Sequence, residues 1–322
     1  MTAPESARTM STPDIDMTQA PMAQAIIQHH APVFAAEGID HSALPPQPVP
    51  PATQSQPAYL AALRACSQLG FIAQDAECLA RAWQAQTERT GRFDAAHWPD
   101  DPRDFGLIPA AAALPPAFAP CPQSLGLYAV LPDAQWVGRM ARAGVPTVQL
   151  RFKSEDPQAI EREVRAAVAA VQGTSALLFI NDHWQAAIEA GAYGVHVGQE
   201  DLDAMQAEDL ERIRAAGLRL GVSTHGYAEM LRAQAVRPSY IALGAVFPTT
   251  LKRMATAPQG VARLAAYVRL MRQYPLVAIG GIGAQQFPEV LATGAGSIAV
   301  VRALVAAEDP EGQAKALQAA WR

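Results

Sequence analysis

The sequence predicts an α/β protein, a (β/α)8 TIM barrel preceded by a proline-rich, partly helical N-terminal extension. Two observations lead to this prediction. From Leu125 onward, short apolar runs alternate with helical stretches, and eight such pairs fit within about 200 residues. Before Cys121, by contrast, lie more than half of the 26 prolines. The alternative is a doubly wound open sheet, which is disfavoured because the first βα turn lacks its dinucleotide fingerprint.

The N-terminal part divides into two predicted segments. Residues 1–56 are expected to be disordered, because the run of prolines at 45–51 favours an extended, linker-like chain. Residues 57–122 are expected to hold a helical hairpin over 58–86, broken at Gly70, and then an irregular strap. In the strap, Trp98, Phe105 and Phe118 are interpreted as anchors for an irregular segment rather than as an aromatic cofactor platform.

Residues 123–322 are the predicted barrel domain. Its strands are short apolar runs, as expected where both faces of a sheet are covered. The helices between them are bounded by glycines such as Gly191. The strands are predicted at 127–131, 147–151, 177–180, 194–197, 219–223, 240–243, 276–279 and 297–301. The helices are predicted at 134–143, 157–171, 184–190, 208–216, 227–235, 261–273, 284–292 and 312–320.

Composition excludes several classes of function. The net charge of −5 and the absence of a Lys/Arg block argue against a nucleic-acid partner. No run approaches the roughly 18 to 20 apolar residues that a membrane span needs, and residues 1–36 do not read as a signal peptide. The three cysteines form no CxxC pair, which argues against a disulfide framework or a zinc site and favours a cytoplasmic protein.

Carboxylates follow two successive predicted strands. Asp182 comes after the strand at 177–180, and Asp201 comes shortly after the strand at 194–197. Because the carboxyl ends of parallel strands meet at one rim, the two side chains are expected to lie together and to bind Mg²⁺. The alternative is that each aspartate caps the helix that follows it.

Cations and glycines are predicted at the same rim. Arg151 and Lys153 follow the second strand, Lys252 the sixth and Arg302 the eighth. Facing two carboxylates, they are expected to bind a substrate that carries a diphosphate, with a salt-bridge network as the alternative. The pair 280–281 would offer backbone N–H groups to a second phosphate. His225 is either a general base or a residue held by local hydrogen bonds.

The motifs at these strand ends resemble thiamine phosphate synthase over residues 125–322. They are QLRFK at 149–153, IND at 180–182, GVHVGQED at 194–201, GVSTH at 221–225, FPT at 247–249, APQG at 257–260 and VAIGGI at 277–282. The resemblance implies a transferase of thiamine biosynthesis. It would couple aminomethylpyrimidine-methyl diphosphate to hydroxyethylthiazole phosphate, giving thiamine phosphate and diphosphate with Mg²⁺, by dissociative loss of the diphosphate.

The same resemblance implies roles for individual residues. The pyrimidine diphosphate would be held by Gln149, Arg151, Lys153, Asn181, Ser223 and Lys252. Of these, Arg151, Lys153, Ser223 and Lys252 would act in catalysis. Asp182 and Asp201 would bind Mg²⁺. The thiazole phosphate would face Thr249, Gly281, Val301 and Arg302.

Two departures from the family pattern leave alternatives open. Leu251 stands where the family usually has a threonine, and Arg302 stands where a serine usually follows Val301. Arg302 and Thr250 could replace the two missing hydroxyl groups. Alternatively, the barrel binds the pyrimidine diphosphate as a sensor or scaffold without coupling it. A thiazole tautomerase is a further alternative, which the full set of diphosphate-binding residues disfavours. The N-terminal helices resemble those of hydroxymethylpyrimidine kinases, but no second activity is predicted. A partner-binding role for them and a homo-oligomer stay open.

Overall fold

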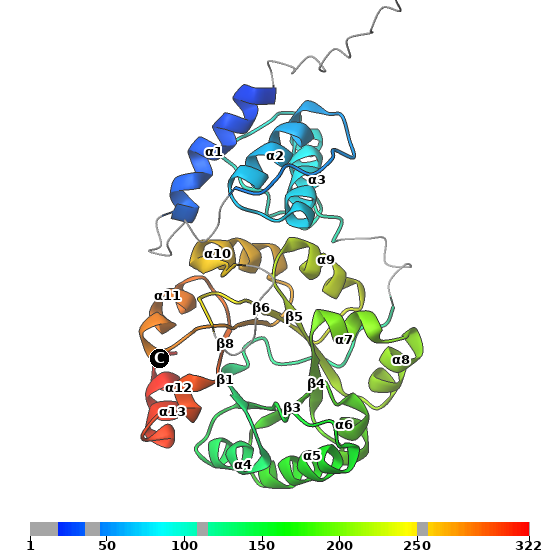
Figure 1. The fold of residues 1–322 in the computed structure, drawn as a ribbon, viewed down its shortest axis with the longest axis vertical. Coiled ribbons are helices and arrows are strands. Elements are labelled where there is room, and N and C mark those ends of the chain that lie inside the picture. The colour runs from blue at the N-terminus through cyan, green and yellow to red at the C-terminus, as the bar shows by residue number, and fades with distance from the viewer. Residues whose placement is uncertain (1–18, 36–45, 108–114, 250–256, 322) are drawn as a thin grey trace, which may run out of the picture.

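Eight parallel strands close into a barrel in which strand order follows chain order (Figure 1). The computed structural model describes residues 19–35, 46–107, 115–249 and 257–321. Each strand pairs in parallel with the next, and β1 also pairs with β8. The strands are β1 (Gly126–Leu131), β2 (Thr147–Leu150), β3 (Leu177–Asn181), β4 (Gly194–Val197), β5 (Arg219–Thr224), β6 (Tyr240–Leu243), β7 (Leu276–Ala278) and β8 (Ser297–Val300).

Helices surround the barrel, and several begin at an aspartate whose side chain accepts a backbone N–H of the first turn, as at Asp133, Asp156 and Asp309. None of the described helices combines the length and apolar character needed to cross a bilayer. The helices are α4 (Ala134–Arg142), α5 (Pro157–Val171), α6 (Trp184–Ala190), α7 (Gln199–Ala204), α8 (Ala207–Ala215), α9 (Tyr227–Ala235), α10 (Gly260–Met271), η3 (Ala284–Gln286), α11 (Phe287–Ala292), α12 (Arg302–Val305) and α13 (Pro310–Ala319).

The predicted barrel is confirmed. Each predicted strand is present, and its ends differ from the prediction by one residue at most. The helix predicted over 284–292 is divided into η3 and α11, because Pro288 has no backbone N–H and starts a new helix. The short helices α7 and α12 were not predicted.

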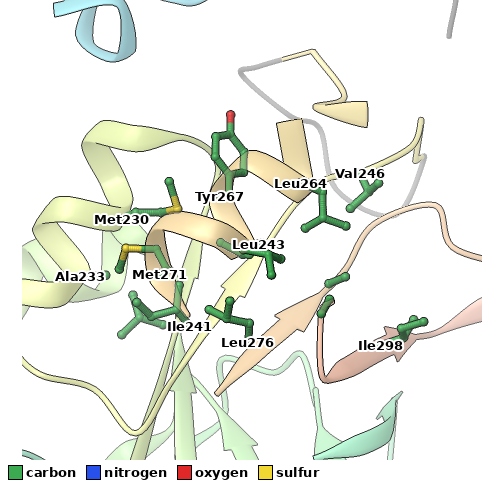
Figure 2. Packing of buried hydrophobic residues seen from close by; sticks show 14 of the residues in the cluster. Met230, Ala233, Ile241, Leu243, Val246, Leu264, Tyr267, Met271, Leu276 and Ile298 are labelled. Carbon is green, nitrogen blue, oxygen red and sulfur yellow. The ribbon is translucent and has the colours of Figure 1, made fainter. Parts of the chain in front are cut away.

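Two apolar layers hold the barrel together. The inner layer fills the barrel and includes Tyr128, Phe179 and Tyr240. The outer layer lies between the strands and the surrounding helices. Figure 2 shows part of it, where Met230 of α9 and Met271 of α10 lie close to the β6 and β7 side chains. Burial of this apolar surface is the main stabilising contribution to the barrel wall.

Three helices of the N-terminal extension lie together beside α9 and α10 (Figure 1). They are α1 (Gln19–Ala35), α2 (Pro57–Gln68) and α3 (Ala73–Thr90). The predicted hairpin over 58–86 is confirmed as α2 and α3. We use the name N-terminal unit for residues 19–35 and 46–107.

The prediction of disorder over 1–56 was wrong for residues 19–35. They form α1, in which Ile26 is fully buried, and α1 packs against α2. Pro32 lies inside the helix and obscured its pattern in the sequence. Residues 46–56 carry no helix or strand, and the remainder of that segment lies outside the described residues. The limits at 56 and 122 stay predictions.

The strap after α3 is anchored by aromatic side chains, as predicted. Trp98 and Phe118 are buried, and Phe105 packs partly buried against the core. Trp98 stacks on Phe71 and contacts the edge of Trp83. These contacts fill the core of the N-terminal unit, which supports the anchor interpretation over a cofactor platform.

Candidate active site

The predicted site residues come from the carboxyl ends of several strands. Because all strands are parallel, these ends form one rim of the barrel. Arg151 and Lys153 follow β2, Asp182 follows β3, and Asp201 lies in the first turn of α7 after β4. Arg151 is half-buried and Lys153 is exposed, so both cations have access to a ligand from solvent.

Asp182 and Asp201 face each other. Burial and the nearby Asp201 charge raise the pKa of the Asp182 carboxyl group, while Lys153 acts in the opposite direction. The side chains of Asp182 and Asp201 are also within hydrogen-bonding distance. Asp182 has a φ of 63°, a strained value for a residue with a side chain, and such strain is often found at functional sites.

The capping alternative applies to only one of the two aspartates. Asp201 Oδ2 accepts the Gly198 N–H at 3.0 Å, as in a capping box of α7. Asp182, however, is not the residue that precedes α6; that residue is His183, and its side chain forms no capping bond. A helix cap therefore does not account for the position of Asp182.

The carboxylate pair fits Mg²⁺. Two carboxylates supply the hard oxygen donors that this ion prefers, and it usually keeps several ligand positions for water or phosphate oxygens. Among the described residues there is no group of three or more His, Cys, Asp or Glu side chains placed to hold a metal. The remaining ligands would thus come from water and substrate, which is usual for Mg²⁺ bound with a diphosphate.

Gln149 and Asn181 are joined by a hydrogen bond from Gln149 Nε2 to Asn181 Oδ1, 2.9 Å long. Gln149 is buried at 4% exposure, whereas Asn181 is half-buried and lies at the end of β3. The structure thus brings together two of the residues assigned to the pyrimidine diphosphate. The oxygen of the same Gln149 amide, Oε1, accepts a hydrogen bond from the Tyr128 hydroxyl at 2.9 Å.

A chain of hydrogen bonds continues through the barrel interior to Ser223. The Tyr128 and Tyr240 hydroxyls are 2.8 Å apart, Tyr240 Oη is 2.6 Å from His196 Nδ1, and His196 Nε2 is 2.8 Å from Ser223 Oγ. Burial raises the pKa of both tyrosines, so both hydroxyls keep their protons.

The bond directions in this chain determine the tautomer of His196. Tyr128 donates to Gln149, so its oxygen accepts from Tyr240, and Tyr240 in turn accepts from His196 Nδ1–H. In the neutral imidazole, Nε2 then has a lone pair and accepts the Ser223 hydroxyl proton. Ser223 Oγ is therefore oriented with its own lone pairs available to a ligand.

The backbone of Ser223 is held from a second direction. Gln199 Nε2 donates to the Ser223 carbonyl oxygen at 2.6 Å. Gln199 Oε1 accepts two bonds from Arg232 of α9, at 2.9 and 2.6 Å. Tyr128, His196 and Tyr240 were not predicted as site residues, because a polar residue inside an apolar strand does not show from the sequence which side of the barrel it faces.

Two adjacent glycines after β7 allow the loop that follows this strand to approach the loop after β6 closely. Gly280 and Gly281 have positive φ values, and a Cβ on Gly281 would lie 2.6 Å from the Pro248 carbonyl oxygen. Thr249 follows Pro248 directly and is half-buried. This close approach is enough to explain a glycine at position 281. Binding of a phosphate by Gly281 therefore stays a prediction.

The other predicted residues have mixed outcomes. Val301 precedes α12, and Arg302 is exposed at its start. His225 Nδ1 lies 2.7 Å from Glu229 Oε2, and its backbone N–H donates to the same oxygen, which supports the interpretation of a locally held histidine. Lys252, Thr250 and Leu251 lie outside the described residues.

Comparison with known proteins places the barrel among synthases of thiamine phosphate. The family model described as thiamine monophosphate synthase matches residues 127–304. A thiamine-phosphate synthase of Neisseria meningitidis is 55% identical over 204 residues, covering 63% of this chain and 98% of that protein. One from Escherichia coli is 55% identical over 194 residues, covering 60% of this chain and 90% of that protein.

A solved structure agrees with these sequences. The thiamine phosphate pyrophosphorylase of Pyrococcus furiosus superimposes with a TM-score of 0.55 at 29% identity, covering 61% of this chain and 95% of that chain. The N-terminal unit lies outside the residues that the family model matches.

Proposed function

Because the chain belongs to the thiamine monophosphate synthase family, we propose that its barrel rim joins a pyrimidine-methyl diphosphate to a thiazole phosphate, giving thiamine phosphate and diphosphate. The observation that best supports this reaction is the arrangement of charged and polar side chains at the rim. There the paired carboxylates Asp182 and Asp201 lie near Lys153, and the Gln149–Asn181 pair lies at the adjoining strand ends.

Charge neutralisation is the main contribution of the rim to catalysis. When the diphosphate departs first, negative charge accumulates on its oxygens while the pyrimidine-methyl group becomes cationic. Arg151 and Lys153, both after β2, would stabilise the departing anion together with Lys252. The thiazole nitrogen then attacks the cation, so no protein nucleophile is required.

Asp182 and Asp201 would hold Mg²⁺ through their carboxylate oxygens. When bound, the ion supplies further positive charge to the diphosphate oxygens. The raised pKa of Asp182 supports this role, because two close carboxylates are unfavourable together unless a cation lies between them.

Ser223 would bind the pyrimidine ring. Its hydroxyl proton is directed to His196 Nε2, so Oγ can accept a hydrogen bond from the ring amino group. Asn181, linked through Gln149 and the two tyrosines to the same network, would contact the same substrate from β3. The network orients both side chains before substrate arrives, which lowers the cost of alignment.

Thr249, Gly281, Val301 and Arg302 would face the thiazole phosphate. Arg302 is exposed at the rim after β8, where a guanidinium group binds phosphate through charge-assisted hydrogen bonds. Arg302 would thereby replace the hydroxyl that the family usually has at this position.

The test is thiamine phosphate formation by the purified full-length protein. Both substrates are supplied, first with Mg²⁺ and then with a chelator, and the product is quantified by chromatography. Product that requires both substrates and disappears on chelation is the expected result. Binding of the pyrimidine diphosphate without product would replace this proposal by the sensor hypothesis. Product formation unaffected by chelation would contradict the Mg²⁺ assignment alone.

A further inference from the structure

A buried carboxylate of the N-terminal unit reaches the barrel at the start of α9. Asp75 lies in the first turn of α3 and is only 4% exposed. Its Oδ1 accepts the backbone N–H of Ala228 at 2.9 Å, and the backbone N–H of Tyr227 also donates to the Asp75 carboxyl group. These N–H groups belong to the first turn of α9 and have no partner within their own helix. Asp75 therefore caps a helix of the barrel from outside the barrel.

The barrel provides no cap of its own at this position. α4, α5 and α13 are each capped by the aspartate that precedes them. The residue before α9 is instead Gly226, which has no side chain, and a Cβ there would lie 2.0 Å from Asp75 Oδ2. Gly226 and Asp75 thus fit each other, since any side chain at 226 would occupy the space of the carboxylate.

Further contacts of the N-terminal unit hold the same turn. Trp98 Nε1–H donates to the Tyr227 hydroxyl at 2.9 Å, and Phe105 stacks on the Tyr227 ring with an interplanar angle of 8°. Arg263 of α10 donates to the Leu69 carbonyl oxygen at 2.8 Å. The first turn of α9 is therefore packed against Trp98 and Phe105, which precede the barrel, as well as against Tyr267 of α10.

Helix α9 is connected to Ser223 at both of its ends. On the N-terminal side, Ser223 is three residues before Gly226 in the chain, and Glu229 of α9 accepts the intervening His225 N–H at 2.8 Å. On the other side, Arg232 of α9 holds Gln199, which donates to the Ser223 carbonyl oxygen. A displacement of α9 would consequently move Ser223 through two independent connections.

We propose that Asp75 is a positioning residue for the synthase reaction: by capping α9 from the N-terminal unit, it holds Ser223 in place for the pyrimidine diphosphate. This role rests on the proposed function of Ser223. The N-terminal unit then serves the active site without touching substrate.

The test moves the helix cap from position 75 to position 226 in the full-length chain. Asp75→Ala is expected to lower kcat/KM for the pyrimidine diphosphate about five- to tenfold, mainly through KM, and to leave KM for the thiazole phosphate unchanged. Gly226→Ser alone is expected to cause a similar loss, because its Cβ meets the carboxylate. Combined, the two changes should restore much of the activity, since Ser is a good cap once Asp75 is removed. Asp75→Asn, which keeps an acceptor oxygen, should stay near wild type.

The matched control is Asp104→Ala. Asp104 is a buried carboxylate of the same unit, and its side chain accepts hydrogen bonds from Arg89, at 2.7 and 2.6 Å, rather than from α9. The control should lower stability and leave both KM values unchanged. An equal KM rise in this control, or wild-type kinetics in Asp75→Ala, would overturn the proposal, as would a double variant no better than either single one.

Amide exchange separates this proposal from the proposed function. Hydrogen–deuterium exchange at the first turn of α9 should be faster in Asp75→Ala and slow again in the double variant, whether or not product forms. Unchanged exchange in Asp75→Ala would overturn the cap even in an active enzyme. If the wild-type protein makes no product, the positioning role fails together with the proposed function, while faster exchange in Asp75→Ala would still confirm the cap.

Discussion

Asp182 combines features that are costly for a carboxylate unless it has a function. It is half-buried, its φ is positive, and Asp201 lies beside it. Asp182→Ala should reduce Mg²⁺-dependent turnover at least about 100-fold, because the ion loses a charged ligand next to the diphosphate. Turnover is measured over a range of Mg²⁺ concentrations.

A matched control is available in the same rim. Glu200 precedes Asp201 directly and is exposed, so Glu200→Gln removes a negative charge without removing a proposed ligand. Its turnover should stay within about twofold of wild type, as expected for an exposed charge. Comparable losses in both variants, or none in Asp182→Ala, would contradict the assignment of Asp182 to the metal.

Tyr240 determines the hydrogen-bonding state of His196 and Ser223. Its oxygen accepts from His196 Nδ1, and its proton is donated to Tyr128. Tyr240→Phe should lower kcat/KM about tenfold or more, because His196 loses the acceptor that fixes its tautomer. The pH–rate profile should also change.

Tyr193→Phe serves as the comparison for Tyr240. Tyr193 hydrogen-bonds Cys121, and the guanidinium group of Arg219 lies over its ring; Arg219 starts β5, at the opposite end of the strand from Ser223. Its loss should leave the pH–rate profile unchanged. Wild-type kinetics in Tyr240→Phe would show that His196 does not depend on this bond.

The positions of the rim residues could be predicted from the sequence, whereas the hydrogen bonds of the barrel interior could not. Asn181 and Asp182 end an apolar run abruptly, so their place at a strand end follows from the sequence alone. Tyr128 and Tyr240, however, meet across the barrel from β1 and β6, which are not neighbouring strands. Such a contact depends on barrel closure, and no local pattern contains that information.

The element α12 begins with Arg302 at the rim after β8. If the guanidinium group binds the thiazole phosphate, Arg302→Ser should raise KM for that substrate about tenfold and leave KM for the pyrimidine diphosphate unchanged. Initial rates are measured with each substrate varied in turn. Higher activity in this variant would instead show that Arg302 impairs the site.

The contact between α3 and α9 makes stability depend on pH. Burial raises the pKa of Asp75 from 3.8 to about 6, with Arg263 acting against the rise and Glu229 adding to it. The folded state therefore binds the proton more tightly than the unfolded state. The contribution of this group to stability falls by up to about 3 kcal/mol as the pH rises from about 4 to 6.

Asp75→Asn tests this linkage. The free energy of unfolding is measured in urea between pH 4 and 7.5 for both proteins. The variant cannot titrate at this position, so its stability should increase relative to wild type as the pH rises through that window and then level off. Neighbouring Cys66 and Tyr227 stay protonated, because burial raises the pKa of both. A constant difference between the two proteins would contradict the raised pKa.

Most elements followed from local patterns, and the exceptions have physical reasons. The strands are apolar runs that stop at polar or glycine residues, and their ends were predicted within one residue. α1 was missed because the prolines at 45–51 and Pro32 within the helix favoured an extended chain, whereas packing against α2 stabilises the helix. α7 was missed because it is short and begins within the predicted rim motif.

At the scale of the whole molecule, one apolar core spans the N-terminal unit and the barrel wall. Ile26, Trp83 and Trp98 belong to the same buried cluster as Tyr267 and the outward-facing side chains of the strands. Tyr267 lies on α10 in Figure 2, beside the barrel residues of this cluster. A continuous core of this kind favours unfolding as a single cooperative unit rather than as two independent domains.

Arg263 connects the two parts of that core, and its removal tests their coupling. Its guanidinium group lies 3.8 Å from the Phe71 ring centroid and donates to Leu69, and the residue is 4% exposed. Calorimetry of the wild type should give one transition. Arg263→Ala should lower Tm by roughly 4 to 8 °C or split the transition, because a buried cation–π contact and hydrogen bond are lost. Arg269→Ala, whose Asp100 partner is partly exposed, should change Tm little. Two transitions in the wild type would contradict a shared core.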